Sequence, residues 1–342
     1  MGRQGLPPPP EGGGVRPEHQ VNTPSVGSDP RLRAALRRLD LRIVHRLDGL
    51  LHGEHLGLRL GPGSEAAEAR LYQPGEDDVR HMDWAVTART DTPHVRDLVA
   101  DRELESWTLL DLSPSMDFGT GLRSKRDVAV GALVAANLLT QRVGDRFGAH
   151  FLHQGRIRRW PARSGKEALL SLLATVAAAP PGDRRAPEAG QAGLADALTD
   201  LVRTRRRRGL RVVISDFLDT PAFGGEVAWE RPLRQLASRH QVLAVEVLDP
   251  RELDVPEVGD VALRDPTTGR VRDVRLTRTV RERYRRAAEA QRAAIRGALR
   301  RCGVHHLVLR TDRDWVLDTA RFVIDQRRTA HHMARHTPGV PR

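Results

Sequence analysis

From about residue 106 onward, short apolar runs of β type alternate with longer segments of helical periodicity. The runs that predict strands are 106–112, 146–153, 210–215, 241–247 and 304–309. The segments that predict helices are 123–143, 165–179, 191–206, 227–239, 278–301 and 313–327. Strands that alternate with helices are typical of a mostly parallel sheet with helices on both faces. We therefore predict a doubly wound α/β fold.

Two hairpins are expected beside this alternation. The first joins the 146–153 strand to a short strand at 156–160 through Gln154-Gly155. The second joins 261–263 to 271–276 around a Pro-Thr-Thr-Gly turn. Such turn residues between alternating apolar runs favour antiparallel pairing.

The chain divides into four parts by composition. Residues 1–29 are rich in proline and glycine and are predicted to be disordered. Residues 30–103 are predicted to hold a helix at 30–51 and a small β-rich element, with short strands near 69–72 and 94–98. The α/β domain is expected over 104–327, and residues 328–342 are expected to form a polar, frayed tail.

A carboxylate and two hydroxyl groups follow the first strand of the α/β region. They belong to Asp111, Ser113 and Ser115, which come directly after the apolar run 107–110. Asp216 follows the 210–215 strand in the same way. Because the carboxyl ends of parallel strands meet at one edge, where open α/β sheets bind ligands, we expect the four side chains to converge.

One charged and two neutral oxygens suit Mg²⁺ or Mn²⁺ better than zinc. The four residues are therefore candidate metal ligands. The alternative is structural, because aspartate and serine also form turns and cap helices. In that case Asp111 and Ser113 only shape the loop before the next helix.

A second ordered motif spans residues 72–84 and reads Tyr-Gln-Pro-Gly-Glu-Asp-Asp-Val-Arg-His-Met-Asp-Trp, followed by Thr87-Ala88-Arg89. Its Pro-Gly pair fits the centre of a type II turn. We expect the turn to lead into a short helical or irregular segment with one buried aromatic ring. The positions singled out as a partner-binding or structural motif are Gly75, Asp78, Arg80, Asp83, Trp84 and Arg89.

These two motifs, in this order and about 25 residues apart, resemble the bacterial domain of unknown function 58 family over residues 50–250. That resemblance implies a von Willebrand A-like domain, and Asp-x-Ser-x-Ser resembles its metal-ion-dependent adhesion site. In that site a partner's carboxylate fills the free position of the cation. The family's second metal loop has a threonine, whereas the matching segment here, 190–194, has none. A water would have to replace that oxygen.

The resemblance also implies partners, since such proteins are typically encoded beside MoxR-type AAA+ ATPases. The expected role is a non-enzymatic adaptor that helps a MoxR-like AAA+ ATPase act on an unknown client protein. The Ser-Asp-Phe sequence at 215–217 resembles the same family's third loop.

Two further classes remain open, the first of them because of the net charge of +12. One is an arginine-rich nucleic-acid-associated protein that uses the cluster Arg205, Arg206, Arg207 and Arg208 as an anionic docking patch. Against it, lysine stands at only two of 56 basic positions, which is typical of codon bias, and only 4% of residues are aromatic. The other class is a metal-dependent phosphoesterase, which would need a positioned base or second metal near Asp111.

The lone cysteine, Cys302, excludes an internal disulfide and a cysteine-based zinc site. No segment approaches the ~20 consecutive apolar residues that span a bilayer. The first residues also lack the apolar core of a secretory signal. We therefore expect a cytoplasmic protein without a membrane span.

Overall fold

The computed structural model describes residues 69–73, 79, 82, 84–96, 105–121, 123–140, 145–181, 190–204, 208–221, 224–256, 258–264 and 271–336. Several predictions lie outside these residues. They are the disordered segment 1–29, the helix at 30–51, and the sites Gly75, Asp78, Arg80, Asp83, Arg205, Arg206 and Arg207.

Within the described residues, the central sheet has six strands in the order β10-β7-β6-β3-β4-β5. Their bounds in that order are His305–Arg310, Gln241–Leu248, Leu210–Ser215, Glu105–Asp111, Arg146–His153 and Arg156–Arg163. All neighbouring pairs are parallel except β4 and β5. The structure confirms the predicted doubly wound, mostly parallel sheet.

The antiparallel β4–β5 pair is closed by a two-residue turn. Gln154 and Gly155 both have positive φ, 50° and 64°. Two consecutive positive φ values are the signature of a type I′ turn, whose twist matches that of the flanking strands. The predicted hairpin is present, and β5 continues three residues past its predicted end at 160.

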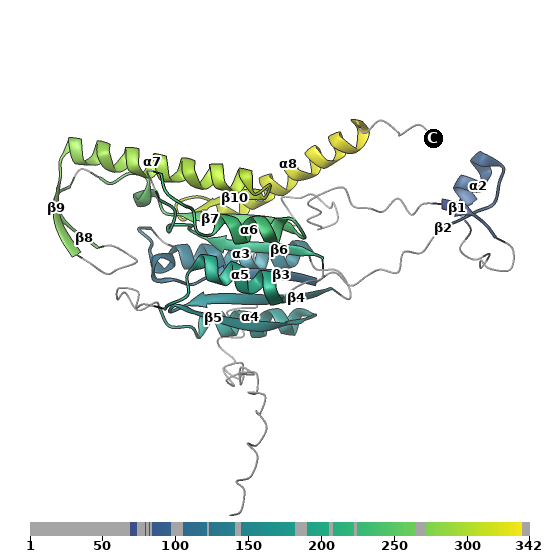
Figure 1. Cartoon of the computed structure of the whole chain (residues 1–342), viewed down its shortest axis with the longest axis horizontal. Coiled ribbons are helices and arrows are strands. Elements are labelled where there is room, and N and C mark those ends of the chain that lie inside the picture. Colours follow the sequence, from purple (N-terminus) through teal and green to yellow (C-terminus); the bar gives the residue numbers. More distant parts are fainter. Residues whose placement is uncertain are drawn as a thin grey trace, which may run out of the picture.

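Helices cover both faces of the sheet (Figure 1). One face packs against α3 (Lys125–Thr140), α4 (Lys166–Ala177) and α8 (Trp315–His336). The other packs against α5 (Leu194–Thr204), α6 (Glu230–Ala237) and α7 (Arg278–Arg301). Each face therefore has its own apolar core.

Successive residues of the inner strands belong to opposite cores. On β3, Leu110 packs in the core of α3, whereas Leu109 packs in the core of α5. On β6, Val212 and Val213 divide in the same way. Since side chains alternate across a strand and both faces are covered, these strands read as continuous apolar runs in the sequence.

The N-terminal described element is a small antiparallel pair with one helix. It comprises β1 (Ala69–Leu71), α2 (Trp84–Thr90) and β2 (His94–Arg96). The expectation of a buried aromatic ring was wrong, because Trp84 is 67% exposed. Among the described residues around it, a helix of seven residues and two three-residue strands offer too little surface to enclose an indole.

The C-terminal region adds a hairpin and a longer last helix. Strands β8 (Gly259–Arg264) and β9 (Val271–Leu276) form the predicted hairpin, which precedes α7. The prediction that helix ends at 327 was wrong, because α8 continues to His336. A polar composition does not by itself stop a helix, and no glycine or proline interrupts this segment before 338.

Candidate functional site

The strand order reverses between β3 and β6, which are adjacent in the sheet. If the six strands are numbered 1 to 6 along the chain, their order across the sheet from β5 to β10 is 3-2-1-4-5-6. Doubly wound sheets with this order bind ligands at the switch point between strands 1 and 4. Asp111 ends β3, and Asp216 directly follows β6. The two aspartates therefore meet where the architecture leaves a crevice.

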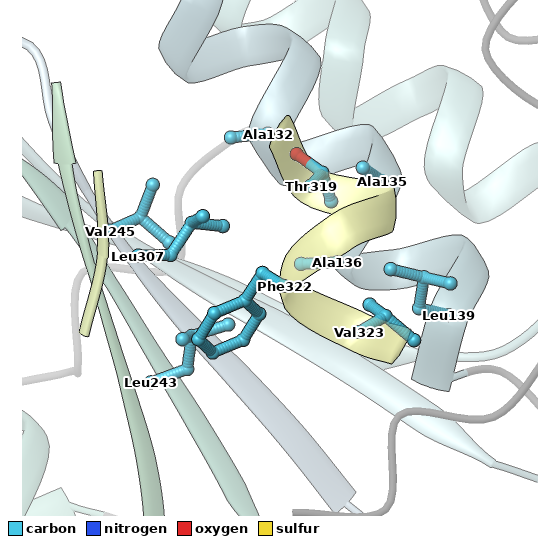
Figure 2. Close-up of a pocket in the computed structure, with 10 residues that line it drawn as sticks. All are labelled: Ala132, Ala135, Ala136, Leu139, Leu243, Val245, Leu307, Thr319, Phe322 and Val323. Atoms are coloured by element: carbon cyan, nitrogen blue, oxygen red, sulfur yellow. The ribbon is translucent and has the colours of Figure 1, made fainter. Parts of the chain in front are cut away.

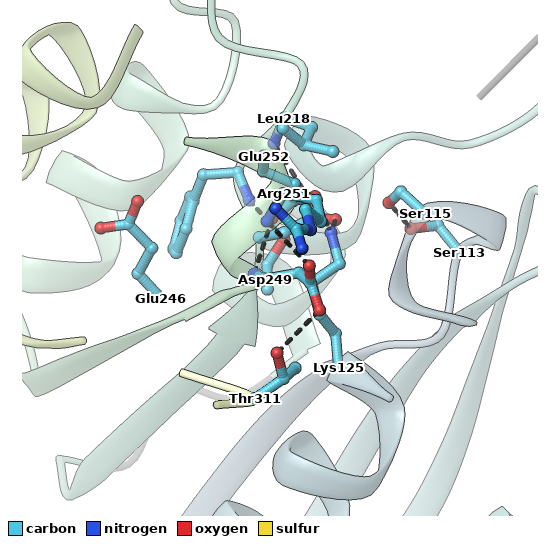
Figure 3. Close-up of polar contacts among 12 residues, drawn as sticks. Ser113, Ser115, Lys125, Leu218, Glu246, Asp249, Arg251, Glu252 and Thr311 are labelled. Carbon is cyan, nitrogen blue, oxygen red and sulfur yellow. Dashed lines mark hydrogen bonds and ion pairs between the residues drawn. The ribbon is translucent and has the colours of Figure 1, made fainter. Parts of the chain in front are cut away.

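The first loop holds two hydroxyl groups side by side. The Asp111 Oδ1 atom accepts a hydrogen bond from the Ser113 backbone N–H at 2.9 Å, which closes a tight turn. A 3₁₀ helix, η3 (Pro114–Asp117), begins at the next residue. The Oγ atoms of Ser113 and Ser115 then lie 3.1 Å apart (Figure 3).

The first and third loops are joined by serine hydroxyls. Ser215 Oγ donates to Asp111 Oδ2 at 2.7 Å, and Asp216 Oδ1 accepts from the Leu218 N–H at 3.2 Å. A hydrogen bond from the Ser115 side chain also helps to lower the pKa of Asp216. The structure thus brings Asp111, Ser113, Ser115 and Asp216 together.

The second loop contributes no hydroxyl group. Its Ala192 N–H donates to the Gly155 carbonyl, and its Gly193 N–H donates to Asp196 Oδ2. A Cβ atom on Gly193 would lie 3.8 Å from Asp219 Oδ2. Asp219 thus brings an oxygen to the loop where the family has a threonine. Asp219 as a whole is exposed, but nearby residues of the protein shield its carboxyl group from solvent. This shielding, together with the charge of Asp216, raises the pKa of Asp219.

A buried lysine that the sequence analysis did not single out completes the cluster. Lys125, the first residue of α3, has no exposed surface. Its Nζ donates to Asp216 Oδ2 at 2.7 Å. The same Nζ also contacts Glu252 Oε1, on the loop that faces Lys125 in Figure 3. The available signal was composition, since Lys125 is one of two lysines in an arginine-rich chain and follows the Asp-x-Ser-x-Ser motif.

Burial and mutual repulsion set the charges of these groups. Burial, together with the charge of Asp216, raises the pKa of Asp111 to about 7. Burial alone would raise the pKa of Asp216, but the Lys125 ammonium and the hydrogen bonds from Lys125, Ser115 and Leu218 together outweigh burial and lower that pKa. For Lys125, the two carboxylates outweigh burial and raise the pKa. Burial dominates at Glu252, whose pKa is raised.

The cluster therefore holds three buried or largely buried carboxylates, those of Asp111, Asp216 and Glu252, and one ammonium, which contacts only the last two. With all of them ionised, two negative charges stay uncompensated at the rim of the sheet. Uncompensated buried charge is costly, and such groups gain protons or bind cations. The charge of one divalent cation would balance the cluster, and the hydroxyl oxygens beside it are ligands that Mg²⁺ accepts.

Glu252 is held in place by a compact cap. It lies in a second 3₁₀ helix, η4 (Pro250–Glu252), and forms a capping box with Asp249. Asp249 is fully buried and accepts four hydrogen bonds through its side chain. Their donors are the Thr120 N–H, the Thr120 hydroxyl, the Thr311 hydroxyl and the Arg251 N–H. This aspartate ties the loop before Lys125 to the ends of β7 and β10.

Two side chains of α7 hold the third loop from its other side. Arg292 Nη1 donates to the Asp216 carbonyl at 3.1 Å and to Glu246 Oε1 at 2.7 Å. Gln291 Nε2 donates to the carbonyls of Leu218 and Thr220. The loop that carries Asp216 is thus fixed by backbone contacts as well as by its own carboxylate.

An apolar pocket lies elsewhere, between α3, α8 and strands β7 and β10 (Figure 2). Its lining is hydrocarbon except for Thr319, whose hydroxyl donates to the Trp315 carbonyl. With that donor already used, the described lining offers no free hydrogen-bond donor to orient a ligand. The polar cluster at the switch point is therefore the better candidate for a functional site.

The remaining described site residues that were predicted belong to other parts of the fold. Trp84 and Arg89 are exposed residues of α2. Arg208 is exposed and precedes β6, at the edge of the sheet opposite Asp216. In the described part of the chain, no three histidine, cysteine or acidic side chains are grouped to hold a metal. None of its helices has the length and apolar character needed to cross a bilayer.

Comparison with known proteins identifies the family. Residues 68–294 match the family described as Protein of unknown function DUF58. The chain belongs to the DUF58 family. It is also 51% identical over 302 residues to an uncharacterized protein of Mycobacterium tuberculosis, covering 88% of this chain and 92% of that protein.

The similar solved structures are more distant. An aerotolerance-related membrane protein from Bacteroides fragilis is 16% identical, with a TM-score of 0.39 over 66% of this chain and 99% of that chain. A von Willebrand factor type A protein from Catenulispora acidiphila is 13% identical, with a TM-score of 0.34 over 67% of this chain and 43% of that chain. The family match over residues 68–294 confirms the predicted family, and the observed sheet confirms the predicted mostly parallel α/β fold.

Proposed function

We propose that this DUF58 protein is a non-enzymatic interaction module that uses the switch-point cluster to bind Mg²⁺ or Mn²⁺ and, through it, a partner's carboxylate. The observation that carries the proposal is the meeting of Asp111, Ser113, Ser115 and Asp216 at the carboxyl edge of the sheet. The uncompensated negative charge supports it, because that charge needs a cation or protons.

The residues present fit such a cation chemically. Ser113 and Ser115 supply two neutral oxygens that lie 3.1 Å apart. Asp111 holds the turn that presents them, and Asp216 adds negative charge from the neighbouring strand. When bound, a divalent cation would supply a Lewis-acidic centre for a carboxylate oxygen of another protein.

The partner class comes from the family resemblance. We infer a MoxR-like AAA+ ATPase as the partner, with a client protein on which the two act together in the cytoplasm. Nucleic acid and phosphoesters are weaker candidates. Arg208, the described member of the arginine cluster, lies away from the switch-point cluster. The one lysine of the switch-point cluster, Lys125, is already paired with carboxylates.

Calorimetric titration with Mn²⁺ and Mg²⁺ tests the cation site. The wild type is expected to bind one ion, and Asp111→Ala is expected to weaken binding by at least about tenfold. Asp260→Ala is the matched control, because it removes an aspartate whose side chain is 81% exposed on the β8–β9 hairpin. Equal heats from the wild type and Asp111→Ala would remove the switch point as the binding locus.

Co-purification tests the partner. A MoxR-type ATPase from the same genome is expected to be retained by the immobilised wild type in Mg²⁺ and released by EDTA. Asp111→Ala is expected to retain less of it. Retention that is the same in Mg²⁺ and EDTA would refute a cation-bridged contact.

A further inference from the structure

Lys125 is out of place for an ordinary helix start. A positive side chain in the first turn of a helix opposes the helix dipole, so helix stability does not explain it. The side chain is also fully buried, which is costly for a charged group unless it is paired. Its position therefore serves its two partners, Asp216 and Glu252.

A compact ammonium suits this position. Lysine carries its charge on one small group with three donors, whereas arginine presents a wide planar fork. The remaining lysine, Lys166, also begins a helix, α4, but it is exposed. The two lysines thus hold equivalent helix positions with opposite burial, and only Lys125 reaches the charged cluster.

The Lys125 ammonium is bonded to the carboxylate that the third loop would offer to a cation. Lys125 Nζ donates to Asp216 Oδ2 at 2.7 Å, and the Leu218 N–H donates to Asp216 Oδ1 at 3.2 Å. Both oxygens of Asp216 are therefore engaged by the protein. Asp111 differs, because its two oxygens accept from the Ser113 N–H and the Ser215 hydroxyl and no ammonium contacts it.

We propose that Lys125 is a positioning residue that keeps Asp216 from coordinating the cation directly. A bound cation would then meet water rather than the Asp216 carboxylate on that side, and a partner's carboxylate would be able to exchange with that water. This inference rests on the proposed function for its biological meaning. Its structural content, that Lys125 restrains Asp216, is tested separately.

The informative variant is the double change Lys125→Met with Glu252→Gln. Removing the ammonium alone would leave two carboxylates unpaired in the interior and could unfold the protein. Removing one negative charge together with the positive one keeps the cluster's net charge equal to that of the wild type. Glutamine can still accept the Asp249 N–H that Glu252 Oε2 accepts at 3.0 Å.

We expect the double variant to bind Mn²⁺ at least about tenfold more tightly than the wild type, because Asp216 becomes a direct ligand. Water-proton relaxation of the Mn²⁺ complex is expected to report fewer exchangeable waters. Adding Asp216→Asn is expected to remove both changes. Lys166→Met, the control at the start of α4, is expected to match the wild type.

The outcomes separate the two proposals. If the folded double variant has the affinity and water count of the wild type, Lys125 does not restrain Asp216 and the inference fails while the proposed function stands. If the wild type binds no ion but the double variant does, the proposed function fails and the inference holds. If neither binds, with circular dichroism showing both folded, both fail.

Discussion

The substitution Asp249→Asn is expected to destabilise the protein although it replaces only one carboxylate oxygen by an NH₂ group. Asp249 Oδ1 accepts from the Thr120 hydroxyl at 2.7 Å and the Arg251 N–H at 2.9 Å. Its Oδ2 accepts from the Thr120 N–H at 3.0 Å and the Thr311 hydroxyl at 2.7 Å. Each oxygen therefore faces one backbone N–H, which cannot turn into an acceptor.

The amide group of asparagine has one oxygen and one NH₂. Whichever way it is turned, the NH₂ faces a backbone N–H, either that of Arg251 or that of Thr120. One buried donor loses its acceptor, which costs about 1–3 kcal/mol, and the other hydrogen bonds lose the strengthening of a charged acceptor. We expect the free energy of unfolding to fall by about 2–4 kcal/mol in total.

Urea denaturation at pH 7, followed by tryptophan fluorescence, measures this loss. Thr311→Val is the matched control, because it removes one of the four donors and leaves the carboxylate in place. It is expected to cost about 1 kcal/mol. An Asp249→Asn variant within about 0.5 kcal/mol of the wild type would refute the reasoning, since surface substitutions already vary by that much.

The pH dependence of the free energy of unfolding tests the role of Asp249 in a second way. The hydrogen bonds from Thr120, Arg251 and Thr311 outweigh burial and lower the pKa of Asp249 in the folded protein. The stability that comes from a lowered carboxylate pKa is present above the unfolded value near 4 and is lost as the pH falls through the folded value. The difference between the wild type and Asp249→Asn should therefore shrink below pH 4.

Three further predictions concern other parts of the fold. Gly148→Ala should cost about 1–3 kcal/mol in urea denaturation, because its Cβ would lie 2.7 Å from Trp107 Cε3, whereas Gly121→Ala, with nothing within 4 Å, should be neutral. Burial raises the pKa of Asp111 to about 7, so between pH 5 and 8 the folded state holds a proton that the unfolded state has released. In EDTA, the free energy of unfolding of the wild type should therefore fall by about 2.5 kcal/mol relative to Asp111→Asn as the pH rises from 5 to 8. Parallel curves of stability against pH would contradict this. Burial raises the pKa of Cys302 to about 11, so iodoacetamide should label it at pH 8 only after unfolding, and rapid labelling of the native protein would be inconsistent with that pKa.

Much of the site was predictable because its first parts are local. Asp111 and Asp216 each follow an apolar strand, and the edge rule for parallel strands places such residues together. The hydroxyl pair of Ser113 and Ser115 belongs to the same short loop as Asp111. A periodic pattern and a topology rule were enough for these residues.

Lys125 and Glu252 could not be placed in this way. Lys125 lies 91 residues from Asp216 in the chain and 127 residues from Glu252. No local pattern marks a lysine at a helix start as buried, because its burial depends on two carboxylates from other loops. The exposed Trp84 shows the reverse case, in which an aromatic residue found too little neighbouring structure to cover it.

By itself, the sequence determined the order of strands and helices, the two hairpins and the edge of the sheet at which the acidic residues stand. These depend on hydrophobic periodicity and on the handedness of the chain, which act over short distances. Only the tertiary structure decided the charge of the cluster, because that charge depends on which distant side chains share one buried volume. Burial makes each missing counter-charge costly, so the pairing of Lys125 with Asp216 and Glu252 sets the charge that the cluster carries.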